Sequence, residues 1–456
     1  MSKANSFRVG KVSAYRRGQV WYLCYFEHGK RRRPRVGPDR NVARQLAAQI
    51  NGQLEVGAPA ALSFEQIGIA DLRTRWLEHH EQVLRSSVQS INRYRTATVH
   101  LLRYLEGHPV RHAGLFQSSH AELFVQHLRG LRVSPNGHAN TAKRPLMDKG
   151  IRYVLECCRA LFNFAAKRRH LSPYAENPFS VLEIDRIPVE NARVIELLTA
   201  EQECSFLQAC DDWQFPVFAT LLFTGLRPGE LCHLLLPDDL DIEKRLLRVR
   251  NKPRLGWQVK TRNQREVPLV PELVELLRHH LAGRIAGPVF RRRRFVEASC
   301  EFDVTSILAM ERELVRRLAE REALKGSSVD RSERLSLAKR LWREIGAVEE
   351  DRVRLEFIRI ARSLNLAGHT APKVFRHQFA TALQEGRVDP LVRNLLMGHA
   401  AAGERTEGHG LGMTAIYTHT RPETIREQLV SALCSREALK AIRQRLRIIR
   451  NQESLE

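Results

Sequence analysis

Six side chains in the second half of the chain are of the types that chemistry on a phosphodiester requires. Two arginines, two lysines and a histidine can hold a phosphate and stabilise negative charge that develops on it. A tyrosine hydroxyl can attack the phosphorus, although a phenol has an ordinary pKa of about 10 and needs nearby cations to act as a nucleophile. These residues lie in FTGLRPGEL, WQVKTRNQREVPL, KVFRHQFATAL, LLMGHA and AIYTHT, and they are Arg227, Lys260, Lys373, Arg376, His399 and Tyr417.

The local sequence predicts how the arginines are positioned. FTGLRPGEL indicates a turn at Gly225 and then a helix start, where backbone N–H groups and the helix dipole favour an anion beside Arg227. Glu230, one turn further on, is placed to orient another side chain of the site. KVFRHQFATAL predicts a helix with Lys373 and Arg376 on one face, because residues three apart are neighbours on a helix.

The other candidates lie beside turns. WQVKTRNQREVPL predicts a β-hairpin with Lys260 beside its turn, where a lysine can deliver a proton. LVRNLLMG predicts a helix that leads into His399, but the stretched segment before Tyr417 contains a second Gly-His pair, so His409 is the alternative. Each motif alone has a plain structural explanation: a helix-capping turn, an exposed lysine or a packed tyrosine. Only their occurrence together favours a site.

The composition predicts a polyanionic partner. The chain has 456 residues, with 74 Lys+Arg against 51 Asp+Glu and a net charge of +23. Such a surplus favours nucleic acid, because basic residues displace its condensed counterions. No apolar run is long enough to span a membrane and the first residues lack an apolar signal core, so we expect no membrane partner and a cytoplasmic location. The eight cysteines form no metal-binding or disulfide pattern, and we expect no metal site.

The front of the chain predicts a small basic module. Residues 8–55 contain three β segments, with turns at Gly18 and Gly29, and then a short amphipathic helix. Charge runs are more often simply solvated, but the charge of the whole chain favours a face that contacts DNA. The candidate contacts are Arg16, Arg17, Lys30, Arg31, Arg32, Arg33 and Arg35.

The rest of the chain is predicted to be mainly helical. Helical periodicity marks residues 64–85, 90–106, 118–130 and 148–169. Arg168 and Arg169 end the last of these helices, where they could meet DNA phosphates or equally well complement the helix dipole.

A linker near 183–195 precedes the region with the candidate site. Thr199 and Gln202 then have the spacing of a capping box at a helix start. Short strands are predicted around LLRVR, WQVKT and REVPL. Residues 296–366 are rich in charge and predict a pair of helices hinged near Gly326, which could contact a partner or be only a solvated insertion.

The six candidate residues, in this order over residues 200–430, resemble the tyrosine recombinases, or phage-type integrases. The resemblance implies a mainly α, multidomain protein with small β elements. Its parts would be an arm-type DNA-binding module at 1–60, a helical core-binding (SAM-like) domain at 61–190 and a catalytic domain at 191–456 that contains the insertion at 296–366. The sequence departs from the family at Lys373, where most members have histidine, and in the long interval before Tyr417.

The resemblance also implies a mechanism. Tyr417 would attack the scissile phosphate of duplex DNA, form a 3′-phosphotyrosyl link and release a 5′-hydroxyl. Arg227 and Arg376 would stabilise the transition state, with Lys373 and His399 as further donors. Lys260 would protonate the leaving oxygen. No cofactor would be required.

Several partners are implied as well. The protein would work as a tetramer on recombination sites, with possible accessory DNA-bending or directionality proteins, to integrate or excise a mobile element. The segment SREALKAIRQRLRIIRNQ would be a candidate to dock onto a neighbouring protomer. The alternatives are a type IB topoisomerase-like enzyme and a non-catalytic DNA-binding protein derived from a recombinase.

Overall fold

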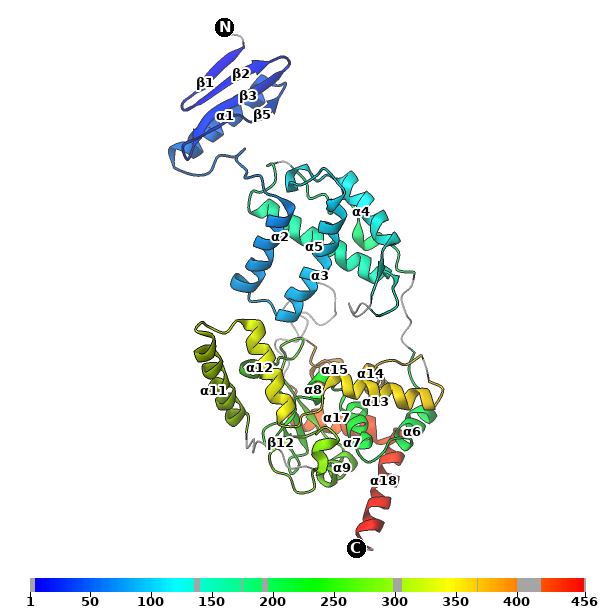
Figure 1. The fold of residues 1–456 in the computed structure, drawn as a ribbon. Coiled ribbons are helices and arrows are strands. Elements are labelled where there is room, and N and C mark those ends of the chain that lie inside the picture. Colours follow the sequence, from blue (N-terminus) through cyan, green and yellow to red (C-terminus); the bar gives the residue numbers. More distant parts are fainter. Residues whose placement is uncertain are drawn as a thin grey trace. The chain divides into compact units, whose positions relative to one another are not determined.

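The computed structural model describes residues 5–134, 140–173, 175–190, 196–297, 306–366, 368–399 and 420–454. The chain divides into two compact units, Met1–Arg193 and Val194–Glu456. Both are mainly helical with small β-sheets, which confirms the predicted fold class (Figure 1). Among the described helices, none has the length and apolar character needed to cross a membrane.

The first unit begins with an antiparallel sheet covered by one helix. The helix, α1 (Arg40–Glu55), packs on the sheet through Ala43, Ala47 and Ile50. The sequence predicted three strands, but the sheet has five. The first was not anticipated, and the last predicted strand is divided at Pro34, which has no N–H to donate to a strand ladder. The strands are β1 (Ser6–Val9), β2 (Val12–Arg17), β3 (Val20–Glu27), β4 (Lys30–Arg32) and β5 (Arg35–Gly37).

Four helices with a core of their own complete the first unit, and the sequence predicted all four. Their apolar faces share one cluster that includes Leu101, Phe124, Leu155 and Phe162. The helices are α2 (Ile69–Glu78), α3 (Val88–Glu106), α4 (Ser118–Gly130) and α5 (Asp148–Lys167), with a π-helical turn (His79–Val83) directly after α2. The small strands β6 (Arg132–Val133) and β7 (Arg144–Pro145) pair between α4 and α5.

The second unit is built around the buried helix α7 (Gln214–Thr224), all of whose residues are buried. Phe206, Phe218, Phe357 and Phe375 form mutual ring contacts in its core. Its helices before residue 300 are α6 (Ala200–Gln208), α7, α8 (Pro228–Leu231), α9 (Pro271–Leu281) and α10 (Arg294–Glu297). Its later helices are α11 (Ile307–Lys325), α12 (Arg331–Glu344), α13 (Glu350–Ser363), α14 (Lys373–Glu385), α15 (Pro390–Met397), α17 (Pro422–Cys434) and α18 (Ala438–Glu453). The predicted capping box at Thr199 and Gln202 is present at the start of α6.

Short strands border the helices of this unit. β10 (Leu246–Val249) lies between β9 (Leu240–Asp241) and β11 (Arg265–Pro268) in an antiparallel sheet. The predicted strand at WQVKT is absent, and residues 250–264 form an irregular connection. In it the Asn251 side chain accepts a hydrogen bond from Val259 N through Oδ1 at 2.9 Å and donates one from Nδ2 to Arg262 O at 2.8 Å. A separate pair joins β8 (Leu235–Leu236) to β12 (Gly287–Pro288).

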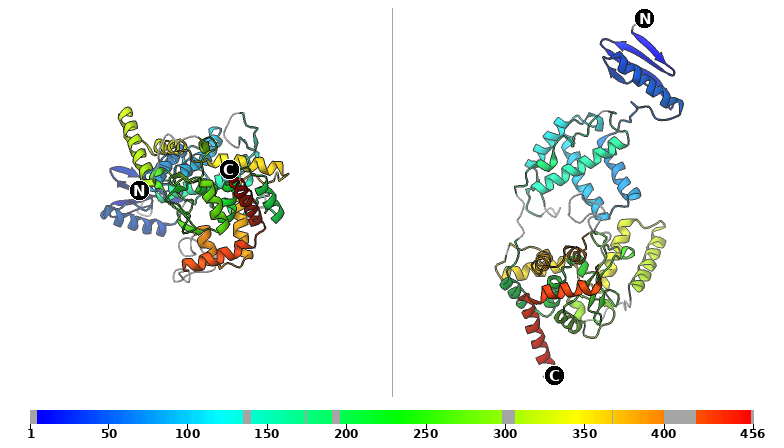
Figure 2. Two further views of the ribbon diagram at one scale, coloured as in Figure 1. Left: turned by 90° about the horizontal axis from the view of Figure 1, so that it is seen from below. Right: turned by 180° about the vertical axis from the view of Figure 1, so that it is seen from behind.

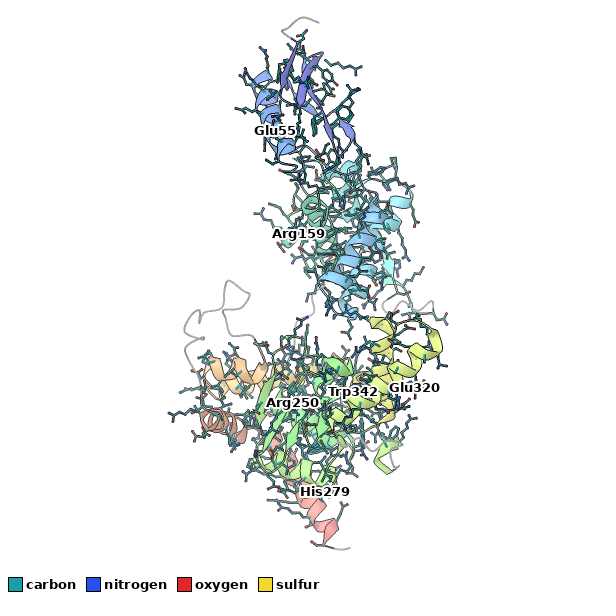
Figure 3. All side chains as sticks on the ribbon, turned by 90° about the vertical axis from the view of Figure 1, so that its left-hand side faces the viewer. Glu55, Arg159, Arg250, His279, Glu320 and Trp342 are labelled. Carbon is teal, nitrogen blue, oxygen red and sulfur yellow. The ribbon has the colours of Figure 1, made fainter. Side chains whose placement is uncertain are left out.

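The charged segment 296–366 has two different environments. α11 and α12 form the predicted hairpin, in which Gly326 ends α11 at φ 68° and Asp330 caps α12. The hairpin has a small core of its own in which Trp342 is buried, whereas Glu320 lies on the outer helix (Figure 3). By contrast, α13 belongs to the main core through Phe357, so only the hairpin is an appended element.

The last helix, α18, packs on its own unit in this structure. Leu439, Ile442 and Leu446 are buried, and Arg443 Nη2 pairs with Glu272 Oε1 of α9 at 2.7 Å. The end of α18 projects from the unit (Figure 2). The helix that the sequence suggested for docking onto a neighbour is therefore held within its own chain along its first turns.

Candidate active site

The turn between α7 and α8 requires glycine at position 225. Gly225 has φ 62°, and a Cβ there would lie 2.2 Å from the ring of Phe379. After this turn Arg227 caps α8, and Pro228 occupies the first helical position, where its missing N–H costs nothing. The predicted turn and helix start are thus confirmed, although the helix is only one turn long.

The carboxylate of Glu230 organises the arginines. Glu230 has 2% of its side chain exposed; it accepts bonds from the Arg227 backbone N at 2.9 Å and from Arg227 Nη1 at 2.7 Å. Arg265 grips the same carboxylate with Nη1 at 3.2 Å and Nη2 at 2.6 Å. Burial would raise the pKa of Glu230, but the two arginines outweigh it and hold that pKa below its usual range. The prediction that Glu230 orients another side chain is confirmed.

Arg265 is the member of this cluster that sequence reasoning missed. It lies on β11 opposite Val249 of β10, with its side chain 4% exposed, whereas the neighbouring cross-strand pair of Arg248 and Glu266 remains more accessible. A Cβ on Gly398 would lie 3.0 Å from Arg265 Nη1, so Arg265 also packs against the end of α15. The available signal was strand alternation: in REVPL the arginine shares the inward face with Val267. An inward arginine requires a buried carboxylate partner.

Arg376 joins the same cluster from α14. It is buried, with Nη1 donating to Gly225 O at 2.7 Å and Nη2 donating to Met397 O. Its guanidinium therefore ties the turn before α8 to the end of α15. Burial and the positive charge of Arg227 lower the pKa of Arg376 to about 10, so the group still carries its charge near pH 7.

His399 lies beside these arginines. Gly398 ends α15 at φ 62°, and His399 N donates to Asn394 O at 3.0 Å. The imidazole pKa is lowered by partial burial and then by the positive charges of Arg376, Arg227 and Arg265. His399 is therefore neutral near pH 7, with one ring nitrogen able to donate and the other to accept.

The two lysines lie at the border of the cluster. Lys260 is exposed in the connection 250–264, inside a turn that is closed by Arg262 N donating to Val259 O at 2.8 Å, but the strand predicted before this turn is absent. Its neighbour Thr261 donates from Oγ1 to Gly398 O at 3.0 Å, which brings Lys260 next to the His399 backbone. Lys373 is the exposed first residue of α14, one turn before Arg376. The structure thus brings Arg227, Arg376 and His399 together, with Lys260 and Lys373 exposed on adjoining segments. Tyr417 and the alternative His409 lie outside the described residues.

The candidate DNA contacts of the first unit differ in their surroundings. Arg32 lies 3.4 Å from the buried Glu27, and Arg31 Nε donates to Cys24 Sγ at 3.2 Å. Arg168 lies over a phenylalanine ring, and Arg169 donates to Pro59 O and Ala60 O at 3.4 Å, so both have contacts within the unit. The exposed members of the set are Arg16, Arg17, Lys30, Arg31, Arg33, Arg35, Arg168 and Arg169.

Metal chemistry has no candidate ligands in the part of the chain that the structure describes. There, no three His, Cys, Asp or Glu side chains are grouped so that they could hold a metal ion.

Residues 196–299 match the model of the phage integrase family. The match covers Arg227, Glu230, Lys260 and Arg265, and it confirms the resemblance to a family of DNA strand breaking and rejoining enzymes. No curated protein matches the chain.

Solved structures of three integrase complexes are similar to the chain. The Tn1549 transposon integrase with transposon right end DNA is 17% identical, with a TM-score of 0.49 over 80% of this chain and 98% of that chain. A lambda integrase dimer bound to a COC′ core site is 15% identical, with a TM-score of 0.47 over 91% and 94%. A lambda integrase tetramer bound to a Holliday junction is 16% identical, with a TM-score of 0.45 over 86% and 97%. Because each TM-score is below 0.5, the function proposed below rests on the family match and on the contacts of the site.

Gly225→Ala should destabilise the second unit clearly more than Gly283→Ala. Both glycines have positive φ, 62° and 77°, so alanine costs about 1–2 kcal/mol of backbone strain at either position. Only at Gly225 does a ring stand in the way, and such overpacking adds about 1–3 kcal/mol. Hydrogen exchange of the α7 and α14 amides in urea measures the difference. Equal losses of stability in the two variants would show that the Phe379 ring moves aside without a free-energy cost.

Proposed function

We propose that the chain is a site-specific tyrosine recombinase that cuts and rejoins duplex DNA through a 3′-phosphotyrosyl link. One observation carries the proposal. Arg227 and Arg376 converge with His399 around the buried Glu230–Arg265 pair, and residues 196–299 of the same unit match the phage integrase family. Preorganised cationic donors of this kind stabilise the charge that develops on a phosphate under attack.

Cleavage would begin with attack of the Tyr417 hydroxyl oxygen on the scissile phosphorus. The bond between phosphorus and the 5′-oxygen breaks, and Lys260 donates a proton to that oxygen. Arg227 and Arg376 bind the non-bridging oxygens, where bidentate guanidinium contacts are strong. The phenol proton passes to one nitrogen of the neutral His399 ring, and the other ring nitrogen can donate to the phosphate. Rejoining is the reverse reaction with the 5′-hydroxyl of another strand.

Lys373 would contribute a donor where most of the family has histidine. An ammonium group is a donor only, so it can bind a non-bridging oxygen but cannot accept the phenol proton near pH 7. The exchange therefore leaves His399 as the one imidazole among the six proposed site residues.

The proposed reaction requires double-stranded DNA and several copies of the chain. Each strand exchanged between two duplexes needs its own tyrosine, so we propose a tetramer on the recombination sites. Integration or excision of a mobile element is the corresponding biological role, with accessory DNA-bending or directionality proteins as further partners. The division into an arm module at 1–60, a core-binding domain at 61–190 and a catalytic domain at 191–456 belongs to the same proposal.

Tyr417→Phe should abolish covalent protein–DNA adducts on a nicked suicide substrate and leave DNA binding nearly intact. The substitution removes the attacking oxygen and keeps the ring. Tyr104→Phe is the matched control, because Tyr104 is buried and its hydroxyl has no hydrogen-bond partner among the described residues. Denaturing electrophoresis detects the adduct. Adducts that persist in the Tyr417→Phe variant would refute the nucleophile, and a wild-type chain that binds DNA without forming adducts would favour the non-catalytic alternative.

His399→Ala should slow cleavage far more than His409→Ala. The positive charges of Arg376, Arg227 and Arg265 act on the His399 ring, which lies beside them, and the loss of one preorganised donor typically costs about 10²–10³ in rate. Single-turnover cleavage of the same suicide substrate gives the two rates. A larger loss from His409→Ala would assign the site histidine to the second Gly-His pair.

The double substitution Arg33→Ala/Arg35→Ala should weaken binding to a long attachment site and flatten its salt dependence. Both side chains are exposed on the edge of the sheet, and each phosphate that is no longer neutralised reduces the log–log slope by about 0.9. Arg40→Ala/Arg44→Ala removes the same charge from exposed positions of α1 and should change the slope less. Equal effects would indicate general electrostatics instead of a DNA-contacting face. Cleavage of a short core substrate should survive both changes.

A further inference from the structure

The loop that carries Lys260 is held at both ends. Residues 250–264 connect β10 to β11, and most of the side chains around Lys260 are exposed. On the C-terminal side of Lys260, Thr261 is bonded to Gly398 O at 3.0 Å. On its N-terminal side, the loop is held by the α11–α12 hairpin, the element that the proposed chemistry does not use.

The hairpin grips the 3₁₀ turn η4 (Pro253–Leu255) and the residue after it. Leu255 is 1% exposed and belongs to the hairpin core, and Trp342 Nε1 donates to Leu255 O at 3.1 Å. Gly256 has φ 71°, and a Cβ there would lie 3.0 Å from both Ala338 and Leu335 of α12. The backbone of the loop therefore lies directly against α12, with no room for a side chain between them.

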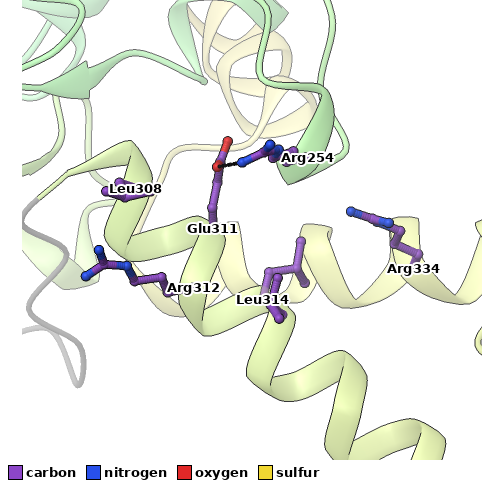
Figure 4. A pocket seen from close by; sticks show the side chains of 7 residues that line it. Arg254, Leu308, Glu311, Arg312, Leu314 and Arg334 are labelled. Carbon is purple, nitrogen blue, oxygen red and sulfur yellow. Dashed lines mark hydrogen bonds and ion pairs between the residues drawn. The ribbon is translucent and has the colours of Figure 1, made fainter.

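An ion pair adds a third contact at the rim. Arg254 Nη1 lies 3.1 Å from Glu311 Oε2 of α11 (Figure 4). Arg254 is 74% exposed, and exposed pairs contribute little to stability. The buried contacts of Trp342 and Leu255, together with the close approach of Gly256 to α12, consequently dominate the attachment of the loop.

A column of rings extends the contact from the hairpin to α8. The His233 ring stacks on Trp257 at 4.8 Å between centroids and meets the edge of Trp342 at 4.6 Å. His233 Nδ1 lies 2.6 Å from Gly229 O, within the helix that begins after Arg227. At the base of the loop, Lys252 N donates a hydrogen bond to Trp257 O at 3.0 Å and Trp257 N donates one to Lys252 O at 3.1 Å. The hairpin thus touches both the loop of Lys260 and the helix of Glu230.

We propose that the α11–α12 hairpin is a positioning element for Lys260 and that Trp342 is its principal positioning residue. The inference rests on the proposed recombinase function. A general acid must come within hydrogen-bond reach of the leaving oxygen, and a lysine on a free loop has about 2 kcal/mol of rotamer entropy to lose. When the backbone is fixed on both sides of Lys260, only the side chain has to find the leaving oxygen. A misplacement of the ammonium group by about 1 Å can slow the reaction about 10²-fold.

The test compares suicide substrates whose scissile 5′-bridging atom is oxygen or sulfur. A 5′-thiolate leaves without a proton, so the sulfur substrate does not need the general acid. Trp342→Ala should slow cleavage of the oxygen substrate by about 10²-fold and leave the sulfur substrate near the wild-type rate. Lys260→Ala should show the same pattern, because both changes would remove the same proton transfer.

Two further variants keep the result interpretable. Trp342→Phe retains a ring and loses only the N–H that binds Leu255 O, so it should show a smaller loss with the same rescue by sulfur even where the alanine variant fails to fold. Leu324→Ala changes an 83% exposed residue at the far end of α11 and should cleave both substrates normally.

The outcomes separate the inference from the function on which it rests. Equal slowing of both substrates by folded Trp342 variants, or no slowing at all, would overturn the positioning role while wild-type adducts still support the recombinase. A Lys260→Ala defect that sulfur does not rescue would also overturn it, because Lys260 would then not be the acid. Absence of adducts from the wild-type chain on both substrates would refute the proposed function and the inference with it.

Discussion

The need to neutralise one buried carboxylate governs the arrangement of the second unit. Glu230 is almost fully enclosed, and an ionised carboxylate in that position is strongly unfavourable unless cations surround it. Arg227 comes from the residue before α8 and Arg265 from β11, so the ion pairs fix the distance between a helix and a sheet. Arg376 adds α14 and α15 by donating to the carbonyls of Gly225 and Met397. These contacts hold together segments that are far apart in the sequence, because each buried charge and carbonyl needs a partner.

The same arrangement holds more positive charge than its own carboxylate can balance. Three arginines lie around one glutamate. Burial lowers the pKa of Arg376 and of the neighbouring His399, and the positive charges of the other arginines lower both further. A bound phosphate would offset the repulsion between these cations. The free-energy cost of bringing the cations together is met when the chain folds, before any phosphate binds. Donors that are already oriented need no rearrangement as charge develops, which is the property that makes such sites effective in catalysis.

The sequence predicted the parts of this site that are defined by local pattern. Arg227 follows a glycine turn and precedes a proline, and Lys373 and Arg376 share a helix face, so neighbouring residues were enough to place them. Arg265 was missed because its partner, Glu230, lies on another element. One arginine in a basic chain becomes distinctive only when its position on the strand is known to point into the core. The strand predicted at WQVKT failed for a related reason, since the bonds of the Asn251 side chain replace a ladder there.

Tertiary contacts also explain why the predicted insertion at 296–366 divides into an appended hairpin, α11–α12, and a helix of the main core, α13. α13 has the charge-rich composition of the hairpin before it, but Phe357 places it among the rings of the main core.

The end of α15 connects the charge cluster to the loop of Lys260. Met397 O accepts a bond from Arg376, Gly398 packs its α-carbon against Arg265, and the Gly398 carbonyl accepts the bond from Thr261. One short stretch of backbone therefore sets both the position of Arg265 and Arg376 and one end of the loop. The hairpin holds the other end through Trp342. Lys260 lies between these two anchors. Its loop and the two arginines contact the same stretch of backbone, Met397–Gly398, so the position of the Lys260 backbone is tied to theirs while its side chain remains exposed.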